Sequence, residues 1–296
     1  MGESPAVARR RVRLALRAAR KAKGLTQTQV ADAMDWSLSK VMRIESGEVN
    51  VSVSDLRVLL PYLDLADSDE AQRLIEDAKI ARRERYSVDP LYREHLSPAL
   101  LQLMQFEQEA TEIRYFHPLL VPGLLQTAAY ASAIFRLDPV GLSEATVKVR
   151  IEARINRRKR LVSQPSPPKY LAILDESVLY REIGGREVMG EQLGELSRAV
   201  ARPNIRVRVL PFTAAVPIAL LGPFGVLDMG DEQDAILYRE SPRSDAIVRN
   251  RREITEHRDI FERLWPCAYS DAESAELIST RAGALLAPAS RGAPPG

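Results

Sequence analysis

The spacing of apolar residues predicts a series of short amphipathic helices over the first 85 residues. Across residues 6–23, Val12, Leu16 and Ala19 recur every three or four positions among largely basic residues, which is the spacing of one helix face. Further helices with apolar stripes are expected over residues 26–35, 37–46, 52–61 and 67–85. The sequence therefore predicts five helices at this end of the chain.

The second and third of these helices have clear start and stop signals. Thr26 is followed three residues later by Gln29, which forms a capping box, and Ser37 is an N-cap for the next helix. Gly47 stands where a left-handed residue ends that helix. Two short helices joined by a tight turn are typical of a helix-turn-helix.

After residue 86 the pattern mixes helices with strands. Helices are expected over residues 97–116, 123–136, 143–161, 185–200, 247–265 and 271–280, and β-strands over 170–174, 205–212, 224–229 and 235–240. The predicted fold is an N-terminal all-α helix-turn-helix domain of five helices (1–85), followed by an α+β domain with a small sheet (86–286). Residues 287–296 are Ala, Pro, Gly, Ser and Arg, and we expect this tail to be disordered.

The composition is that of a globular protein. Of 296 residues, 45% are hydrophobic and 28% charged, and no apolar run approaches the roughly 20 residues that cross a bilayer. The first residues are basic and lack the pattern of a signal peptide. The single cysteine, Cys267, has no partner for an internal disulfide. We expect a cytoplasmic protein without membrane contact.

The net charge of +2 conceals two basic regions. Residues 1–60 contain 11 Lys and Arg against 6 Asp and Glu, and residues 148–160 contain seven basic residues against one acidic residue. Either region can contact a polyanion, although a solvated helix face is the favoured interpretation of the second.

The predicted helix after Ser37 has an outward face that its own core does not use. With Val41 and Ile44 turned inward, the apolar side chains of Leu38 and Met42 must lie in water. They lie beside the Ser39 hydroxyl and the Arg43 guanidinium. A DNA major groove offers thymine methyl groups and guanine O6 and N7 to such side chains. The predicted base-contacting residues are Leu38, Ser39, Met42 and Arg43.

Flanking residues are predicted to contact DNA phosphates, because helix N-termini direct N–H groups toward anions. These residues are Gln27, Trp36, Ser37 and Lys40. For Trp36, packing between the two helices is an equally weighted interpretation.

Residues 9–65 resemble the xenobiotic-response-element, lambda-repressor-like helix-turn-helix family through the blocks GLTQTQVA, WSLSKVMRIESG and SDLRVLLPYL. The resemblance implies that residues 37–45 form the recognition helix for double-stranded DNA. It also implies an ion pair between Arg20 and Glu45 that fixes the first helix to the third. Asp35 departs from the family's usual glycine, and aspartate tolerates the left-handed conformation better than most residues.

Residues 90–285 resemble the C-terminal domain of unknown function of actinobacterial antitoxin-like regulators. The segments that carry this resemblance are FHPLLVPGLLQTAAYA, VKVRIEARINRRKRL, ILDESVLYREIGG, VMGEQLGEL, IRVRVLPF and AILYRE. It implies that the domain binds a small partner protein encoded nearby or senses a ligand.

No catalytic, metal or cofactor site is predicted. The carboxylates Asp175 and Glu176 are interpreted as a strand end and a helix cap, and the three histidines do not have metal-ligand spacing. Residues 121–127, with 220–227 as a lid, are a candidate pocket for an apolar small-molecule effector, although core packing is the favoured interpretation.

These patterns predict a sequence-specific transcription regulator that is not an enzyme and that binds an inverted repeat as a homodimer. A dimer is expected because one helix-turn-helix reads few base pairs. The C-terminal domain would receive a partner protein or a small-molecule signal. The alternative is an antitoxin-like protein that mainly neutralises a small partner protein and binds DNA for autoregulation.

Overall fold

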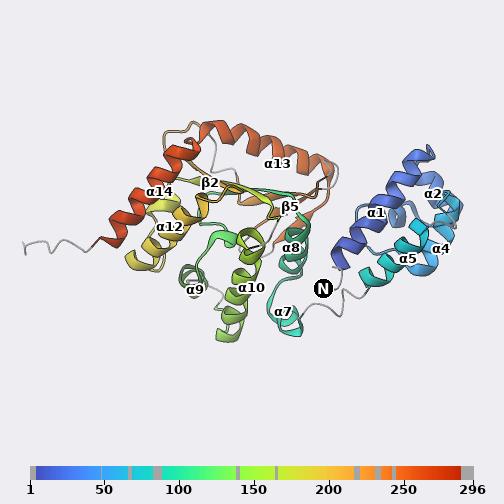
Figure 1. Cartoon of the computed structure of the whole chain (residues 1–296), viewed down its shortest axis with the longest axis horizontal. Helices are drawn as coiled ribbons and strands as arrows, with labels where there is room; N and C mark the ends of the chain where they lie inside the picture. Colours follow the sequence, from blue (N-terminus) through green and yellow to red (C-terminus); the bar gives the residue numbers. More distant parts are fainter. Residues whose placement is uncertain are drawn as a thin grey trace, which may run out of the picture. The chain divides into compact units, whose positions relative to one another are not determined.

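The chain folds into two compact units, residues 1–90 and 91–296 (Figure 1). The computed structural model describes residues 5–47, 49–65, 69–82, 89–137, 141–163, 166–216, 221–230, 235–241 and 245–287. The predicted domain boundary at residues 85 and 86 lies outside the described residues, as does the predicted tail from residue 288 onward.

In its described residues, the N-terminal unit contains the predicted five helices around one apolar core. They are α1 (Pro5–Ala22), α2 (Gln27–Met34), α3 (Leu38–Glu45), α4 (Val53–Tyr62) and α5 (Asp69–Arg82). Leu16 of α1, Leu56 of α4 and Leu74 of α5 are among the buried side chains that join them. The all-α helix-turn-helix prediction is confirmed.

The caps of α2 and α3 have the geometry that their sequence predicts. The Thr26 and Gln29 side chains form the capping box of α2, and the Ser37 hydroxyl accepts the Lys40 N–H at the start of α3. Asp35 ends α2 in the left-handed conformation with φ 54°, and Gly47 follows α3 with φ 77°. The turn between the helices therefore forms with aspartate in place of glycine.

The C-terminal unit is built on a six-stranded mixed sheet. The strands are β1 (Glu112–His117), β2 (Lys169–Asp175), β3 (Ile205–Leu210), β4 (Phe224–Asp228), β5 (Ala235–Arg239) and β6 (Ala246–Val248). Their order is β3-β2-β1-β4-β5-β6, with parallel pairing from β3 to β1 and antiparallel pairing from β1 to β6. Strand β1 thus lies at the junction between the two kinds of pairing.

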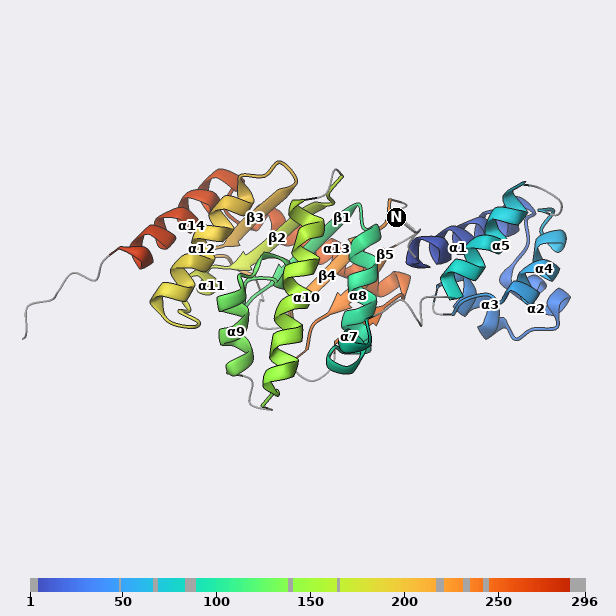
Figure 2. The ribbon, with the colours of Figure 1, turned by 60° about the horizontal axis from the view of Figure 1, so that its bottom comes forward.

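Helices cover both faces of this sheet (Figures 1 and 2). They are α7 (Pro90–His95), α8 (Pro98–Glu109), α9 (Ala128–Arg136), α10 (Glu144–Val162), α11 (Ser177–Tyr180), α12 (Arg186–Val200), α13 (Arg251–Leu264) and α14 (Asp271–Leu286), with 3-10 turns η1 (Gly123–Leu125) and η3 (Trp265–Cys267). Ile113 and Tyr115 of β1 face the larger core, which includes residues of α8, α9, α12 and α14. Phe116 faces the smaller core with Phe261 of α13.

Three predicted helices are wrong at one end. In the helix predicted over residues 123–136, residues 123–125 form the 3-10 turn η1 and α9 begins only at Ala128. Residues 112–116, predicted as the end of a helix, belong to β1, because pairing with β2 and β4 overrides the local helical pattern. Residues 246–248 form β6, and α13 begins only after Asn250, whose side chain accepts the N–H groups of Arg252 and Glu253. The sheet therefore has six strands where four were predicted.

Candidate nucleic-acid interface

The outward face of α3 brings the four predicted base-contacting residues together. Leu38 and Met42 are 42% and 50% exposed, although both are large and apolar. Ser39 and Arg43 are also exposed, and Arg43 Nε donates to the Ser39 carbonyl oxygen at 3.3 Å. The opposite face of α3 is buried through Val41 and Ile44. One side of this helix packs in the core, and the other presents two apolar side chains, a hydroxyl and a guanidinium.

An ion pair fixes α3 to the first helix. Arg20 Nε donates to Glu45 Oε1 at 2.6 Å and Arg20 Nη2 donates to Glu45 Oε2 at 2.9 Å. The two side chains are only 12% and 9% exposed. The hydrogen bond to Glu45 holds the pKa of Arg20 above its ordinary value. This pair, which the family resemblance implied, joins the C-terminal end of α3 to α1.

The predicted phosphate-contacting residues already have contacts inside the domain. Gln27 Nε2 donates to Glu45 Oε2 at 2.8 Å. Lys40 Nζ lies 3.7 Å from the centroid of the Trp36 ring and 3.0 Å from Asp55 Oδ2. Trp36 is partly buried against the core, which favours its packing role. The phosphate contacts of these residues stay predictions.

Asp55 was not singled out from the sequence. It lies in the first turn of α4, three residues after the N-cap Ser52, whose hydroxyl accepts the Asp55 N–H at 3.0 Å. An N-cap followed by an acid in the first turn is a common helix start. That signal predicts the placement of Asp55, but its contact with Lys40 depends on the tertiary fold.

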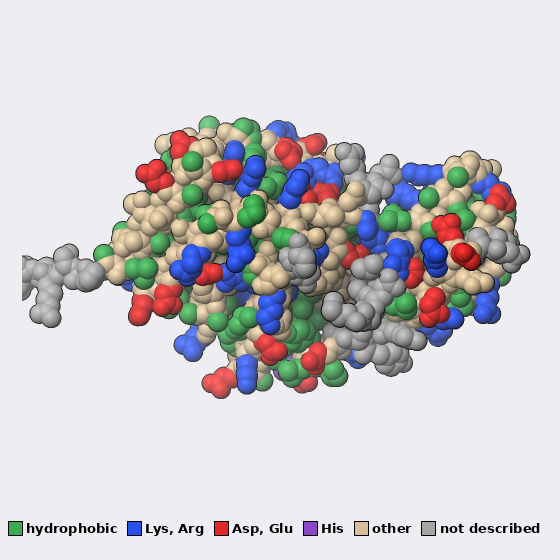
Figure 3. Space-filling model, in the orientation of Figure 1, with side chains coloured by type: hydrophobic (Ala, Val, Ile, Leu, Met, Phe, Trp, Pro, Cys, Tyr) green, Lys and Arg blue, Asp and Glu red, His purple; other side chains and the backbone are tan. Residues whose placement is uncertain are grey.

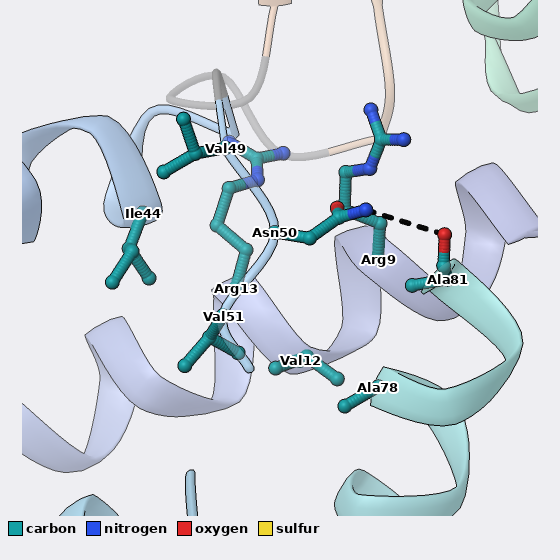
Figure 4. A pocket seen from close by; sticks show the side chains of 9 residues that line it. All are labelled: Arg9, Val12, Arg13, Ile44, Val49, Asn50, Val51, Ala78 and Ala81. Carbon is teal, nitrogen blue, oxygen red and sulfur yellow. Dashed lines mark hydrogen bonds between the residues drawn. The ribbon is translucent and has the colours of Figure 1, made fainter. Parts of the chain in front are cut away.

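The loop after α3 is held against α1 and α5 (Figure 4). Asn50 Nδ2 donates to the Ala81 carbonyl oxygen at 3.2 Å, and Arg9 and Arg13 extend from α1 along the loop in Figure 4. The cavity that these elements enclose is about 10 Å³, which is space for one water molecule. The end of the helix-turn-helix is therefore closely packed.

The second basic region, on α10, turns partly into the C-terminal domain. Arg157 is buried and donates through Nε and Nη2 to the two carboxylate oxygens of Glu107, at 2.8 and 2.6 Å. Arg158 forms an ion pair with Glu195 of α12. On the face shown in Figure 3, Lys and Arg side chains are interspersed with Asp and Glu. The solvated face predicted for this region is wrong for Arg157, because its position on α10 points toward the sheet.

The other candidates from the sequence have structural surroundings. Asp175 Oδ1 accepts the Ser177 N–H at 3.0 Å, and Glu176 Oε2 accepts the Phe212 N–H at 3.0 Å. Within the described part of the chain, no three His, Cys, Asp or Glu residues are placed to hold a metal ion. None of the described helices is long and apolar enough to span a membrane.

The candidate apolar pocket around residues 121–127 is filled by its own side chains. Val121, Leu124 and Leu125 are at most 4% exposed and belong to the larger core. Residue 220, at the start of the candidate lid, lies outside the described residues, whereas Val226 and Leu227 are buried strand residues. Core packing therefore accounts for the described apolar residues of this region.

Two protein families match the chain. A model described as a helix-turn-helix domain matches residues 12–74, and a model described as a domain of unknown function (DUF5753) matches residues 100–280. No curated protein and no solved structure matches the chain. The N-terminal unit is therefore a DNA-binding domain of the helix-turn-helix type.

Proposed function

The chain belongs to the family defined by the domain of unknown function DUF5753, and we propose that it is a cytoplasmic transcription regulator. The proposal combines its DNA-binding helix-turn-helix domain with control through its C-terminal domain. The observation that carries this proposal is the exposed face of α3. Leu38 and Met42 are about half exposed beside Arg43, and a major groove covers apolar groups and binds a guanidinium at the same time. The proposed role is regulatory and needs no catalytic step.

We propose that the regulator binds DNA as a homodimer. One α3 helix reaches only a few base pairs, whereas two copies on an inverted repeat read half-sites about one helical turn apart. Two helix-turn-helix domains on two half-sites supply the specificity that one domain lacks in a genome with many competing sites. The operator is therefore expected to have two-fold symmetry.

Arg43→Ala should weaken binding to the operator by about 1–3 kcal/mol and relax the base preference at one position in each half-site. The physical reason is the loss of a bidentate contact with guanine. Lys40→Ala should weaken binding to operator and random DNA alike and reduce the salt dependence. Both variants are compared by binding titrations on the two DNAs at several salt concentrations.

Lys79→Ala is the matched control, since it removes an exposed cation from α5 that pairs with the neighbouring Glu76. It should change operator binding little. Equal losses on operator and random DNA for Arg43→Ala would remove the base-reading role of Arg43. A loss of binding to operator DNA but not to random DNA for Lys40→Ala would show that Lys40 contacts bases rather than phosphates.

Purification of the full chain from its native host should yield a dimer whose DNA affinity changes when a small molecule is added. Native mass spectrometry gives the stoichiometry, and DNA titrations before and after dialysis give the effect of the small molecule. A small protein that stays bound at fixed stoichiometry until denaturant is added would instead favour the partner-neutralising alternative.

A further inference from the structure

The larger core of the C-terminal domain contains a layer of polar groups between the sheet and α8, α9 and α10. Tyr115 Oη donates to Glu240 Oε2 at 2.8 Å, and His117 Nε2 lies 3.9 Å from the same oxygen. His117 Nδ1 accepts the N–H groups of Leu119 and Leu120 at 3.2 and 3.1 Å, so the ring proton is on Nε2, facing Glu240. Burial lowers the pKa of His117 and keeps this ring neutral.

A glycine in the sheet makes room for this layer. Gly225 of β4 lies between Tyr115 of β1 and Tyr238 of β5 in the strand register. A Cβ atom at Gly225 would lie 2.8 Å from the Tyr115 ring, which is closer than real Cβ contacts. The Tyr115 ring therefore occupies the space above the glycine.

Arg154 and Arg157 of α10, the first half-buried and the second buried, differ in how their donors are used. Arg157 donates through Nε and Nη2 to the two carboxylate oxygens of Glu107, as described above. Arg154 makes no hydrogen bond or ion pair with any described residue, and its Nη1 atom is buried without a partner. Its guanidinium carbon lies 4.4 Å from the centroid of the Phe135 ring. Burial lowers the pKa of Arg154 to about 10, which leaves it charged at neutral pH.

The surroundings of Arg154 do not supply the missing acceptor. Glu240 is the carboxylate whose charge acts most on Arg154, yet it accepts the Tyr115 hydroxyl and forms no ion pair with Arg154. The hydroxyl of Tyr170, a residue with no exposed surface, also lacks a partner among the described residues. Burying a guanidinium nitrogen such as Arg154 Nη1 without an acceptor is costly. The layer therefore has unused donors for acceptor oxygens.

A hollow of about 460 Å³ lies beside this site, between α9 and α10. Phe135, the ring under Arg154, also lines the hollow, together with the apolar side chains of Leu142, Val147 and Ile151. Arg154 follows Ile151 by three residues and is on the same side of α10. Ser132, Arg136, Glu144 and Lys148 complete its polar lining. The volume is in the range of small-molecule sites.

We propose that the C-terminal domain binds a small organic acid, with its carboxylate or phosphate on Arg154 and its apolar part along Phe135 and the hollow between α9 and α10. A planar guanidinium binds two oxygens of such an acid at once. This inference rests on the proposed function only because it names the class of effector for the proposed regulator. Acid binding is tested without DNA, so a failure of the acid site can be distinguished from a failure of the regulatory function.

Thermal unfolding of the full chain with octanoate and with octyl phosphate tests the site. At a hundredfold excess over Kd, a bound acid should raise the unfolding temperature of the C-terminal domain by about 5–10 °C. The larger of the two shifts in unfolding temperature shows whether the site prefers the carboxylate of octanoate or the phosphate of octyl phosphate. Octanol, which has the chain without the charge, and inorganic phosphate, which has the charge without the chain, should give much smaller shifts. The absence of a saturable shift with either acid would overturn the proposal.

Arg154→Gln should abolish the shift, whereas Lys159→Gln, which removes an exposed cation from the same helix, should keep it. Val147→Trp, which fills the hollow and retains Arg154, should reduce the shift as well. Without acid, Arg154→Gln should unfold close to the wild-type temperature, because no described hydrogen bond is lost. Equal shifts in wild type and Arg154→Gln, or a large loss of stability without acid, would overturn the assignment of Arg154. A shift that leaves DNA affinity unchanged would keep the site and contradict control through it.

Discussion

Glu107→Ala should lower the free energy of unfolding of the C-terminal domain by about 3–5 kcal/mol, because it leaves Arg157 buried and charged without its partner. The side chains of Arg157 and Glu107 are 8% and 5% exposed and share two hydrogen bonds. Coulombic attraction and hydrogen bonding to Glu107 raise the pKa of Arg157 against the opposing effect of burial. An arginine side chain is not deprotonated in proteins, so Arg157 cannot escape the loss of Glu107 by releasing its proton.

Urea unfolding measures this loss, with the double variant Glu107→Ala, Arg157→Met as the decisive comparison. Removing both charges should recover much of the stability, since the penalty comes from an unpaired buried charge. Glu256→Ala is the matched control, because it breaks the exposed Arg252–Glu256 pair of α13. A surface pair contributes about 0–1 kcal/mol. A Glu107→Ala protein as stable as this control would contradict the buried-pair assignment.

Glu45→Ala should destabilise the helix-turn-helix domain by about 3–5 kcal/mol and abolish operator binding under conditions where the wild type binds fully. The Glu45 side chain is 9% exposed and accepts hydrogen bonds from Arg20 of α1 and Gln27 of α2. Its loss leaves the Arg20 guanidinium, which is 12% exposed, without its carboxylate. Because the same pair joins α3 to α1, stability and DNA binding should fall together.

Helical circular dichroism in urea follows the unfolding, and a titration with operator DNA follows the binding. Gln27→Ala is the control for a single hydrogen bond to Glu45 and should cost about 0.5–1.5 kcal/mol. Glu45→Gln keeps the shape and should lie between these two variants. Full operator binding by Glu45→Ala would show that α3 keeps its angle without the pair.

The parts of the fold that depend on neighbouring residues could be predicted from the sequence. The capping box of Thr26 and Gln29, the N-cap Ser37 and the glycine at position 47 act within one helical turn, so their pattern is legible locally. The outward face of α3 follows from helical spacing once Val41 and Ile44 are turned inward. The base-contacting face is therefore a prediction from the residues alone.

The parts that depend on distant partners could not be predicted in this way. Strand β1 is set by pairing with β2 and β4, which lie more than 50 and 100 residues further along. Glu107 meets Arg157 fifty residues away, so the basic run on α10 does not reveal which of its members are interior. The Arg20–Glu45 pair was expected only through the resemblance of residues 9–65 to a known family.

The position of β1 at the junction of the mixed sheet also determines the order in which the chain can fold during synthesis. Helices α1 to α5 end at Arg82, so the helix-turn-helix core has all its parts early. Strand β1 cannot pair on both edges until Asp228 of β4 has left the ribosome, and domains generally fold as units during synthesis. The DNA-binding domain should thus be folded while the domain that controls it is still incomplete on the nascent chain.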